Sequence, residues 1–304
     1  MFSVVAPVFG AVALGAALVR WRLFDAATSD GLARFVYYVA IPALLFRSLA
    51  RAELPDVLPW RLILSFYLPS IAMFALGALL ARRCYGWDRA SQGIAGMGAC
   101  YSNMVMLGLP LSHAAFGPAA AVPLFTLLAL QSSILFTLAT WTIEIYGAQG
   151  ARLPLHRALG RLVLNPVILC LLAGVLANLS GLAPTGALDG FLEKLAQAAP
   201  GCALVSLGAS LAQYRITGAL GQAAGLLVIK NLLHPLAVWG MCGLLAVPRD
   251  WARVAVLLAA MPAGVNGYVF AKRYGLHEEV ISKTIVLSTL ASSVAASVVL
   301  AHYL

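Results

Sequence analysis

The sequence has 304 residues, of which 62% are hydrophobic and only 10% are charged, and its mean hydropathy is +0.91. Soluble globular proteins carry about 25% charged residues, so this composition excludes a soluble domain and indicates an integral membrane protein. The net charge of +9 does not indicate a nucleic-acid partner, because the cations are dispersed between apolar segments, as in loops that set membrane orientation.

Ten apolar segments follow one another along the chain, and their length and lack of alternation favour membrane-spanning helices over strands. No cation precedes the first segment and two arginines follow it, the reverse of a signal peptide, so we expect it to remain as the first span. The predicted fold class is all-α integral membrane with ten transmembrane helices. The expected spans are 2–19, 32–50, 61–81, 90–116, 119–146, 158–179, 188–212, 217–247, 251–274 and 279–303.

The cations alternate in density between successive connections. The connections that follow odd-numbered spans carry thirteen Lys and Arg residues and the others carry six, while Lys230 lies within a span. The cytoplasmic side of a membrane protein is the more basic one. We therefore expect a multi-pass protein of the plasma or inner membrane with both termini outside.

The two halves of the chain resemble each other in the order of their helix-disrupting residues. Prolines of spans two and three recur in spans seven and eight, and an asparagine of span four recurs in span nine, at offsets of 158, 166 and 163 residues. Five spans in each half insert the copies in opposite directions, which gives the inverted repeat of secondary transporters. We predict a first five-helix repeat at 1–146, a cytoplasmic linker at 147–157 and a second repeat at 158–304. The matched pairs are Pro42 with Pro200, Pro69 with Pro235, and Asn103 with Asn266.

Spans four and nine contain residues that interrupt a helix within the membrane. Pro110 lacks a backbone donor and clashes with the preceding turn, and Gly108 adds backbone freedom, so we expect the helix to open near 103–110. Span nine contains a similar stretch, "MPAGVNGYVF". Unwound backbone in lipid leaves polar groups unpaired at a cost of several kcal/mol each, so it must line protein or a wet cavity. The alternative is a pair of kinked helices joined by hydrogen bonds.

Corresponding broken helices mark a binding site at the membrane midplane. The N-termini of half-helices suit anions, and asparagine side chains both donate and accept hydrogen bonds. We therefore expect the substrate to lie between the two interrupted spans. The predicted substrate-binding residues are Asn103, Met104, Gly108, Pro110, Pro262, Gly264, Asn266 and Lys230.

Lys230 is the cation that lies inside span eight. A charge near the bilayer centre costs at least about 2.5–3.5 kcal/mol, so it usually has a functional partner, although a lysine near a span end also reaches the surface by snorkelling. Glu144 and His234 join Lys230 as candidates for proton coupling, with an interfacial acid and a packing histidine as the plainer interpretations. Spans four and nine hold no carboxylate in their middles, which disfavours a carboxylate-built sodium site there. The cysteines show no metal-ligand spacing, and we expect no metal or cofactor.

Five stretches of the sequence, taken in order, resemble the auxin efflux carrier family of transporters across essentially the whole chain. The short connection "GAQGARLPLHR" between the halves resembles the bacterial branch, which is often described as permeases for malonate or other organic anions. The five stretches are "YSNMVMLGLPL", "RLVLNPVILCLLAGVL", "LAQAAPGCALVSLGASLA", "VIKNLLHPLAVWG" and "MPAGVNGYVFAKRYG".

The resemblance implies ten helices in two inverted repeats. Spans one, two, six and seven form a scaffold that also forms homodimers, and the other six spans form a domain that moves like an elevator. By motif match, Asn103 and Pro110 belong to one crossover arm and Pro262 and Asn266 to the other, and Lys230 stands where relatives carry a lysine.

We therefore expect an elevator-type secondary carrier of a small organic anion such as malonate, in a lipid bilayer and coupled to protons. A sodium-coupled symporter of the bile-acid type, which shares this fold, is the alternative, and a channel would differ by rapid, non-saturating flux. We do not expect an enzyme, because the sequence contains no HExxH, no GxSxG and no paired intramembrane aspartates.

Overall fold

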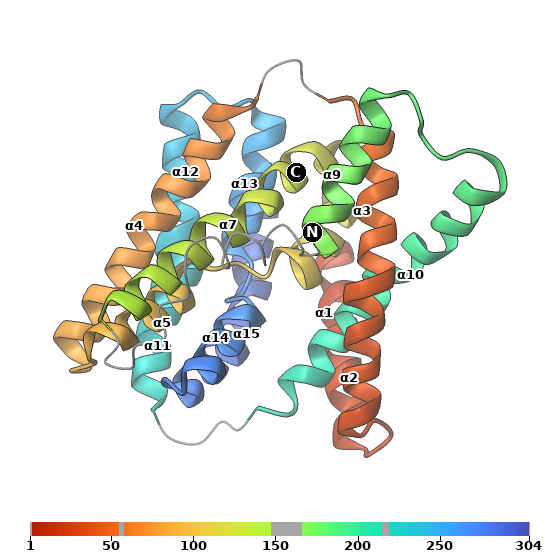
Figure 1. The fold of residues 1–304 in the computed structure, drawn as a ribbon. Helices are drawn as coiled ribbons and strands as arrows, with labels where there is room; N and C mark the ends of the chain where they lie inside the picture. The colour runs from red at the N-terminus through yellow and green to blue at the C-terminus, as the bar shows by residue number, and fades with distance from the viewer. Residues whose placement is uncertain (1, 55–57, 147–165, 215–218, 304) are drawn as a thin grey trace.

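The computed structural model describes residues 2–54, 58–146, 166–214 and 219–303, and the regular elements in these ranges are all helices (Figure 1). The linker predicted at 147–157 and the start of the sixth span lie outside the described residues. The helices are α1 Phe2–Arg20, α2 Ala26–Phe35, α3 Ile41–Ala50, α4 Trp60–Cys84, α5 Arg89–Cys100, α6 Leu109–Phe116, α7 Ala121–Tyr146, α9 Pro166–Leu179, α10 Gly186–Leu211, α11 Leu220–Val228, α12 His234–Leu244, α13 Arg249–Ala260, α14 Val265–Tyr274 and α15 Glu278–Tyr303.

Within the described ranges, five helical stretches are long and apolar enough to cross a membrane: 26–50, 60–84, 104–143, 220–244 and 278–303. The first of these begins six residues before the predicted second span. Asp25 explains the difference, because its carboxylate accepts a hydrogen bond from the backbone N–H of Thr28 at 2.7 Å and so caps the helix there.

In the described part of the chain, three π-helical turns connect helices, and each is followed after one residue by a proline. The turn Val36–Ala40 precedes Pro42, Met104–Gly108 precedes Pro110, and Ile229–Leu233 precedes Pro235. A proline ring clashes with the carbonyl four residues earlier in a regular helix, and the wider turn accommodates it. Pro110 therefore lies in a continuing helix. The interruption expected near 103–110 lies slightly upstream, at residues 101–103.

Helix boundaries recur at a nearly constant spacing in the two halves. The first and last residues of α4 and α5 are 60, 84, 89 and 100, and 160 residues further on the same boundaries appear at 220, 244, 249 and 260. The prolines that suggested the repeat do not match as well, because Pro69 is the tenth residue of its 25-residue helix whereas Pro235 is the sixteenth of the corresponding stretch. The repeated boundaries support an internal repeat more directly than the prolines do.

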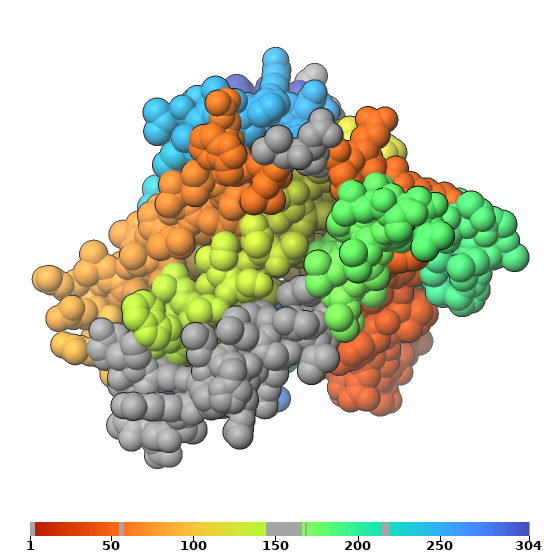
Figure 2. Space-filling model, turned by 45° about the horizontal axis from the view of Figure 1, so that its top comes forward, coloured from red at the N-terminus to blue at the C-terminus, as the bar shows by residue number. Residues whose placement is uncertain are grey.

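The helices pack as two groups, which we call the scaffold body (α1, α2, α3, α9 and α10) and the crossover body (the remaining helices). In Figure 1, α1, α3, α9 and α10 lie together on one side, and α4, α5, α11 and α12 lie on the other. On the face shown in Figure 2, α4 (orange) and α7 (yellow-green) from one body and α9 (green) from the other reach the surface.

Within the scaffold body, α1 and α10 cross with their main chains in close contact. A Cβ atom added at Gly208 would lie 1.9 Å from the carbonyl oxygen of Val12, and one added at Gly15 would lie 2.0 Å from that of Val205. Only glycine permits this approach. An ion pair joins α3 to α10 in the same body: Nε of Arg47 on α3 donates to the carboxylate of Asp189 on α10 at 2.8 Å.

Candidate functional site: the crossover of two interrupted helices

The two helix interruptions lie against each other and form a short antiparallel bridge. Ser102, after α5, pairs with Ala263, after α13. The backbone N–H of Asn103 donates to the carbonyl of Pro262 at 2.9 Å, and the N–H of Gly264 donates to the carbonyl of Tyr101 at 2.8 Å. We call residues 101–103 and 262–264 the crossover. The main chains thus pair with each other, as polar backbone within a membrane must.

Asn103 caps the helix that leaves the crossover. Its Oδ1 accepts a hydrogen bond from the backbone N–H of Met106 at 3.2 Å. Its side chain is only 6% exposed. Among the described residues, neither its Nδ2 nor the neighbouring Ser102 Oγ has a hydrogen-bond partner. Two buried polar groups without a partner next to a helix N-terminus are unusual and are available to a ligand.

Asn266 does not occupy the equivalent place. Gly264 stands at the N-cap of α14, and Asn266 is the second residue of that helix. Because Ser102 pairs with Ala263, the structural counterpart of Asn103 is Gly264. Asn266 is exposed, and its Nδ2 donates to the hydroxyl of Tyr101 at 2.9 Å. Asn103 is therefore part of the crossover itself, whereas Asn266 contacts it through the Tyr101 hydroxyl.

Side chains of neighbouring helices fix the two crossover arms. Gln131 on α7 binds the Ser102 backbone twice, accepting from its N–H at 3.3 Å and donating to its carbonyl at 2.9 Å. On the other arm, the N–H of Ala263 donates to Ser288 Oγ at 2.8 Å, and Ser288 donates to Asn231 Oδ1 at 2.5 Å. These hydrogen bonds therefore fix the positions of both crossover arms relative to the neighbouring helices.

Lys230 lies in the π-helical turn Ile229–Leu233 and is fully buried. Its ammonium group donates to the carbonyl oxygens of Ala259 at 2.7 Å and Met261 at 2.8 Å, and it lies 3.4 Å from His234 Nδ1. The two carbonyls belong to the C-terminal end of α13, where unpaired carbonyls carry partial negative charge. Lys230 therefore caps this half-helix, and all three of its N–H groups face protein acceptors.

The hydrogen bonds around His234 indicate which of its ring nitrogens carries the proton. Ser70 on α4 donates its hydroxyl proton to the carbonyl of Phe66 at 2.7 Å, so its oxygen accepts from His234 Nε2 at 3.0 Å. Nδ1 is then free to accept from Lys230. This hydrogen-bond pattern fits a neutral imidazole beside a charged ammonium group.

The other predicted residues occupy several environments. Met104 and Gly108 are buried, and a Cβ atom at Gly108 would lie 2.8 Å from Leu258, so this glycine allows α6 and α13 to pack closely. Pro262 is part of the bridge. Glu144 lies near the end of α7, and its side chain lies outside the described residues.

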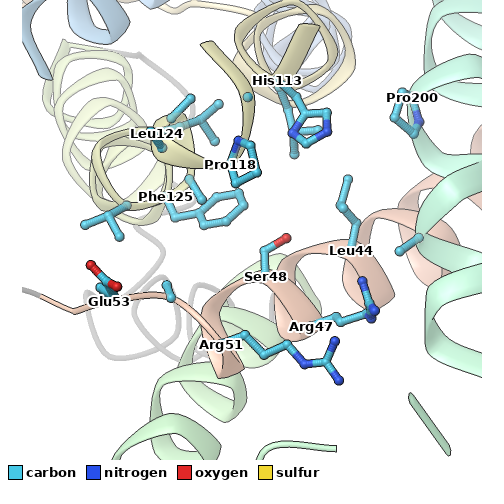
Figure 3. Close-up of a pocket in the computed structure, with 18 of the residues that line it drawn as sticks. Leu44, Arg47, Ser48, Arg51, Glu53, His113, Pro118, Leu124, Phe125 and Pro200 are labelled. Atoms are coloured by element: carbon cyan, nitrogen blue, oxygen red, sulfur yellow. The ribbon is translucent and has the colours of Figure 1, made fainter. Parts of the chain in front are cut away.

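A cavity of about 920 Å³ lies between the two bodies (Figure 3). Its walls come from α3 and α10 of the scaffold body and from α6, α7 and the turn Gly117–Ala120 of the crossover body. Ser48 and His113 extend into the space from opposite walls. Leu109 lines it, whereas none of the crossover residues 101–103 and 262–264 does.

Comparison with known proteins identifies this architecture. A family model described as "Membrane transport protein" matches residues 1–155 and 151–300. The chain belongs to the auxin efflux carrier family. A protein of Rhizobium meliloti (strain 1021) named "Putative malonate transporter" is 30% identical over 298 residues, which cover 95% of this chain and 92% of that protein.

Two further relatives also align along most of the chain. An "Uncharacterized transporter" of Methanothermobacter thermautotrophicus is 31% identical over 89% of this chain and 86% of its own length. "Auxin efflux carrier component 8" of Arabidopsis thaliana is 25% identical over 99% of this chain and 96% of its own length. This auxin efflux carrier family member is thus a membrane transporter and not an enzyme, and the resemblance read from the motifs is confirmed.

The sequence interpretation missed Tyr101, which belongs to the crossover, and Asn231, which contacts it through Ser288. Both had a signal in the sequence, because each directly adjoins a polar stretch that was singled out: Tyr101 precedes Ser102-Asn103, and Asn231 follows Lys230.

Proposed function

We propose that this auxin efflux carrier family member is a secondary carrier of a small organic anion, with malonate as the first candidate. The observation that carries the proposal is the bridge between Ser102 and Ala263, because two broken helices that meet inside a membrane protein create a polar site between apolar layers. The name of the Rhizobium relative supports a dicarboxylate as substrate.

The anion would bind at the arm that carries Asn103. The Nδ2 group of Asn103 and the hydroxyl of Ser102 are buried donors without a partner among the described residues, and a carboxylate accepts hydrogen bonds from both kinds of group. The adjoining helix N-terminus adds a favourable electric field for a negative charge. Gly108 and Pro262 shape the backbone around this position, and Pro110 is the second residue of α6, the helix that continues from it.

We propose an elevator-type mechanism in which the crossover body moves relative to the scaffold body. The close crossing of α1 with α10 at Gly208 and the Arg47–Asp189 ion pair support a scaffold body that stays fixed while the other body moves. The helix boundaries that recur after 160 residues support two five-span repeats, and we propose that these insert as an inverted pair of ten spans. Both termini then lie outside the inner membrane, and the scaffold bodies of two copies form a homodimer.

The position of Lys230 favours a mechanism without sodium. The carbonyl end of α13 favours a positive charge. The ammonium group of Lys230 already provides that charge, so a sodium ion is not needed at this position. Protons are therefore the preferred coupling ion, with the Lys230–His234 pair as the candidate carrier in the described part of the chain and Glu144 as a further candidate. The sodium-coupled symporter of the bile-acid type stays as the alternative.

Uptake of radiolabelled malonate into proteoliposomes tests the proposal. We expect saturable uptake that rises with an imposed pH gradient, does not change when choline replaces sodium, and shows counterflow when unlabelled malonate is inside. Uptake that requires sodium would favour the symporter, and flux proportional to concentration without counterflow would favour a channel. A purified, folded carrier that neither binds nor transports malonate would remove malonate as the substrate.

A further inference from the structure

Tyr101 lies at the centre of the crossover, although its role is not apparent from the sequence. It caps the C-terminal end of α5 with an extended backbone (φ −72°, ψ 114°), so the helix stops there. The side chain is only 4% exposed, and its ring stacks on that of Phe136 from α7, with centroids 5.2 Å apart and planes 14° apart. The orientation of this phenol is therefore fixed by packing.

The hydroxyl group of Tyr101 connects three elements. It accepts a hydrogen bond from Asn266 Nδ2 on α14 at 2.9 Å and lies 3.1 Å from Ser132 Oγ on α7. Asn266 itself is exposed. Among the described residues, the Tyr101 hydroxyl is the one hydrogen-bond partner of the Asn266 amide. A buried, rigid phenol therefore orients an amide that would otherwise rotate freely.

The main chain already holds the crossover together without this hydroxyl. The hydrogen bonds from Asn103 to Pro262 and from Gly264 to Tyr101 run between backbone atoms, and ring stacking does not depend on the hydroxyl oxygen. Removal of that oxygen should therefore release Asn266 and leave the bridge intact. A variant without the hydroxyl therefore tests the orientation of the Asn266 amide without disturbing the stability of the bridge.

We propose that Tyr101 is a positioning residue, whose hydroxyl holds the Asn266 amide so that its remaining N–H meets a carboxylate of the transported anion. The inference deepens the proposed function and depends on it, because it adds a second donor to the site at Asn103. An asparagine with one N–H bound to a phenol keeps one N–H and its carbonyl oxygen for other partners. Donors on both arms suit an anion that carries more than one carboxylate.

A double-mutant cycle on malonate affinity tests this assignment with the full-length carrier. One hydrogen bond is worth about 0.5–1.5 kcal/mol, so Tyr101→Phe and Asn266→Ala should each weaken malonate binding in calorimetry by about two- to tenfold. The double variant should bind no more weakly than Asn266→Ala alone. Tyr85→Phe is the matched control, because it removes a hydroxyl that bonds the Gln222 carbonyl at 3.2 Å outside the crossover, and it should leave affinity unchanged. Unchanged affinity in Tyr101→Phe, or fully additive losses in the double variant, would overturn the inference.

A structure of the Tyr101→Phe variant without substrate tests the same inference independently of malonate. We expect the Asn266 amide to leave its position while the hydrogen bonds between the crossover arms stay. An amide that keeps its orientation would overturn the positioning role. If the unmodified carrier does not bind malonate, the proposed substrate fails, and this structural result still decides the role of Tyr101.

Discussion

The backbone N–H of Asn103 donates a hydrogen bond to the carbonyl of Pro262 across 2.9 Å, although 159 residues separate them in the chain. The pairing brings two interrupted helices together at one place in the fold. Each polar group at this site is satisfied by the opposite arm, by a neighbouring side chain or, as we propose, by the transported anion. Changes at these residues therefore have separable effects on stability and on transport.

Lys230→Met should destabilise the carrier. The substitution keeps the length of the side chain and removes the donors to Ala259 and Met261. A buried acceptor left without a partner costs about 1–3 kcal/mol, and relief of the buried charge offsets part of this, so we expect a net loss of about 2 kcal/mol. Thermal unfolding in detergent measures it, with the exposed Lys194→Met as control. An unchanged unfolding temperature together with lost transport would assign Lys230 to the substrate instead.

Two substitutions at Asn103 separate helix capping from substrate binding. Asn103→Asp keeps the oxygen that accepts from Met106, so the unfolding temperature should not fall, but it removes the Nδ2 donor and repels an anion, so malonate uptake should be lost. Asn103→Ala should lose uptake and also about 1 kcal/mol of stability. Malonate transport at the unmodified rate in Asn103→Asp would show that this side chain does not hold the substrate.

Gly264→Ala should disturb the crossover, whereas Gly267→Ala, in the same helix segment, should not. A Cβ atom at position 264 would lie 2.5 Å from the Tyr101 ring, whereas one at position 267 meets its nearest atom, on Ile281, at an ordinary 3.6 Å. Overpacking of this kind costs about 1–3 kcal/mol. Unfolding temperature and uptake should both fall in the first variant only, and equal behaviour of the two variants would contradict the contact.

A similar pair tests the scaffold body. Gly208→Ala would place a methyl group 1.9 Å from the Val12 carbonyl, so α1 and α10 would have to separate. Gly201→Ala on the same helix meets nothing within 4 Å and should gain up to about 1 kcal/mol from helix propensity. The two variants should thus shift the unfolding temperature in opposite directions. A stabilised Gly208→Ala would show that the helices are further apart.

The sequence predicted an all-helical protein with long apolar helices well, because apolar length is a local property. It also located both interruptions within a few residues, since proline and glycine act on their own backbone. The pairing of Asn103 with Asn266 was less successful. Which residue stands opposite another across a crossover depends on the register of two distant segments, and the bridge shows that Ser102 pairs with Ala263.

The partners of Lys230 illustrate a second limit. A buried lysine suggests a search for a carboxylate, and the sequence offers Glu144 as a candidate. The structure instead places Lys230 against two backbone carbonyls, which every residue possesses, so the sequence does not distinguish them. Likewise, the hydroxyl of Tyr101 reaches Asn266 only because the two arms fold together.

The pairing of the two arms also has a consequence for how the chain is made. Ser102 emerges from the ribosome long before its partner Ala263, and at about 5–20 residues per second the delay lasts about 8–32 s. During that interval the Asn103 N–H and the Tyr101 carbonyl lack the partners that the second half supplies, and they must stay hydrated or bind the insertion machinery. The first half therefore reaches its final packing in the bilayer only after the second half has been synthesised.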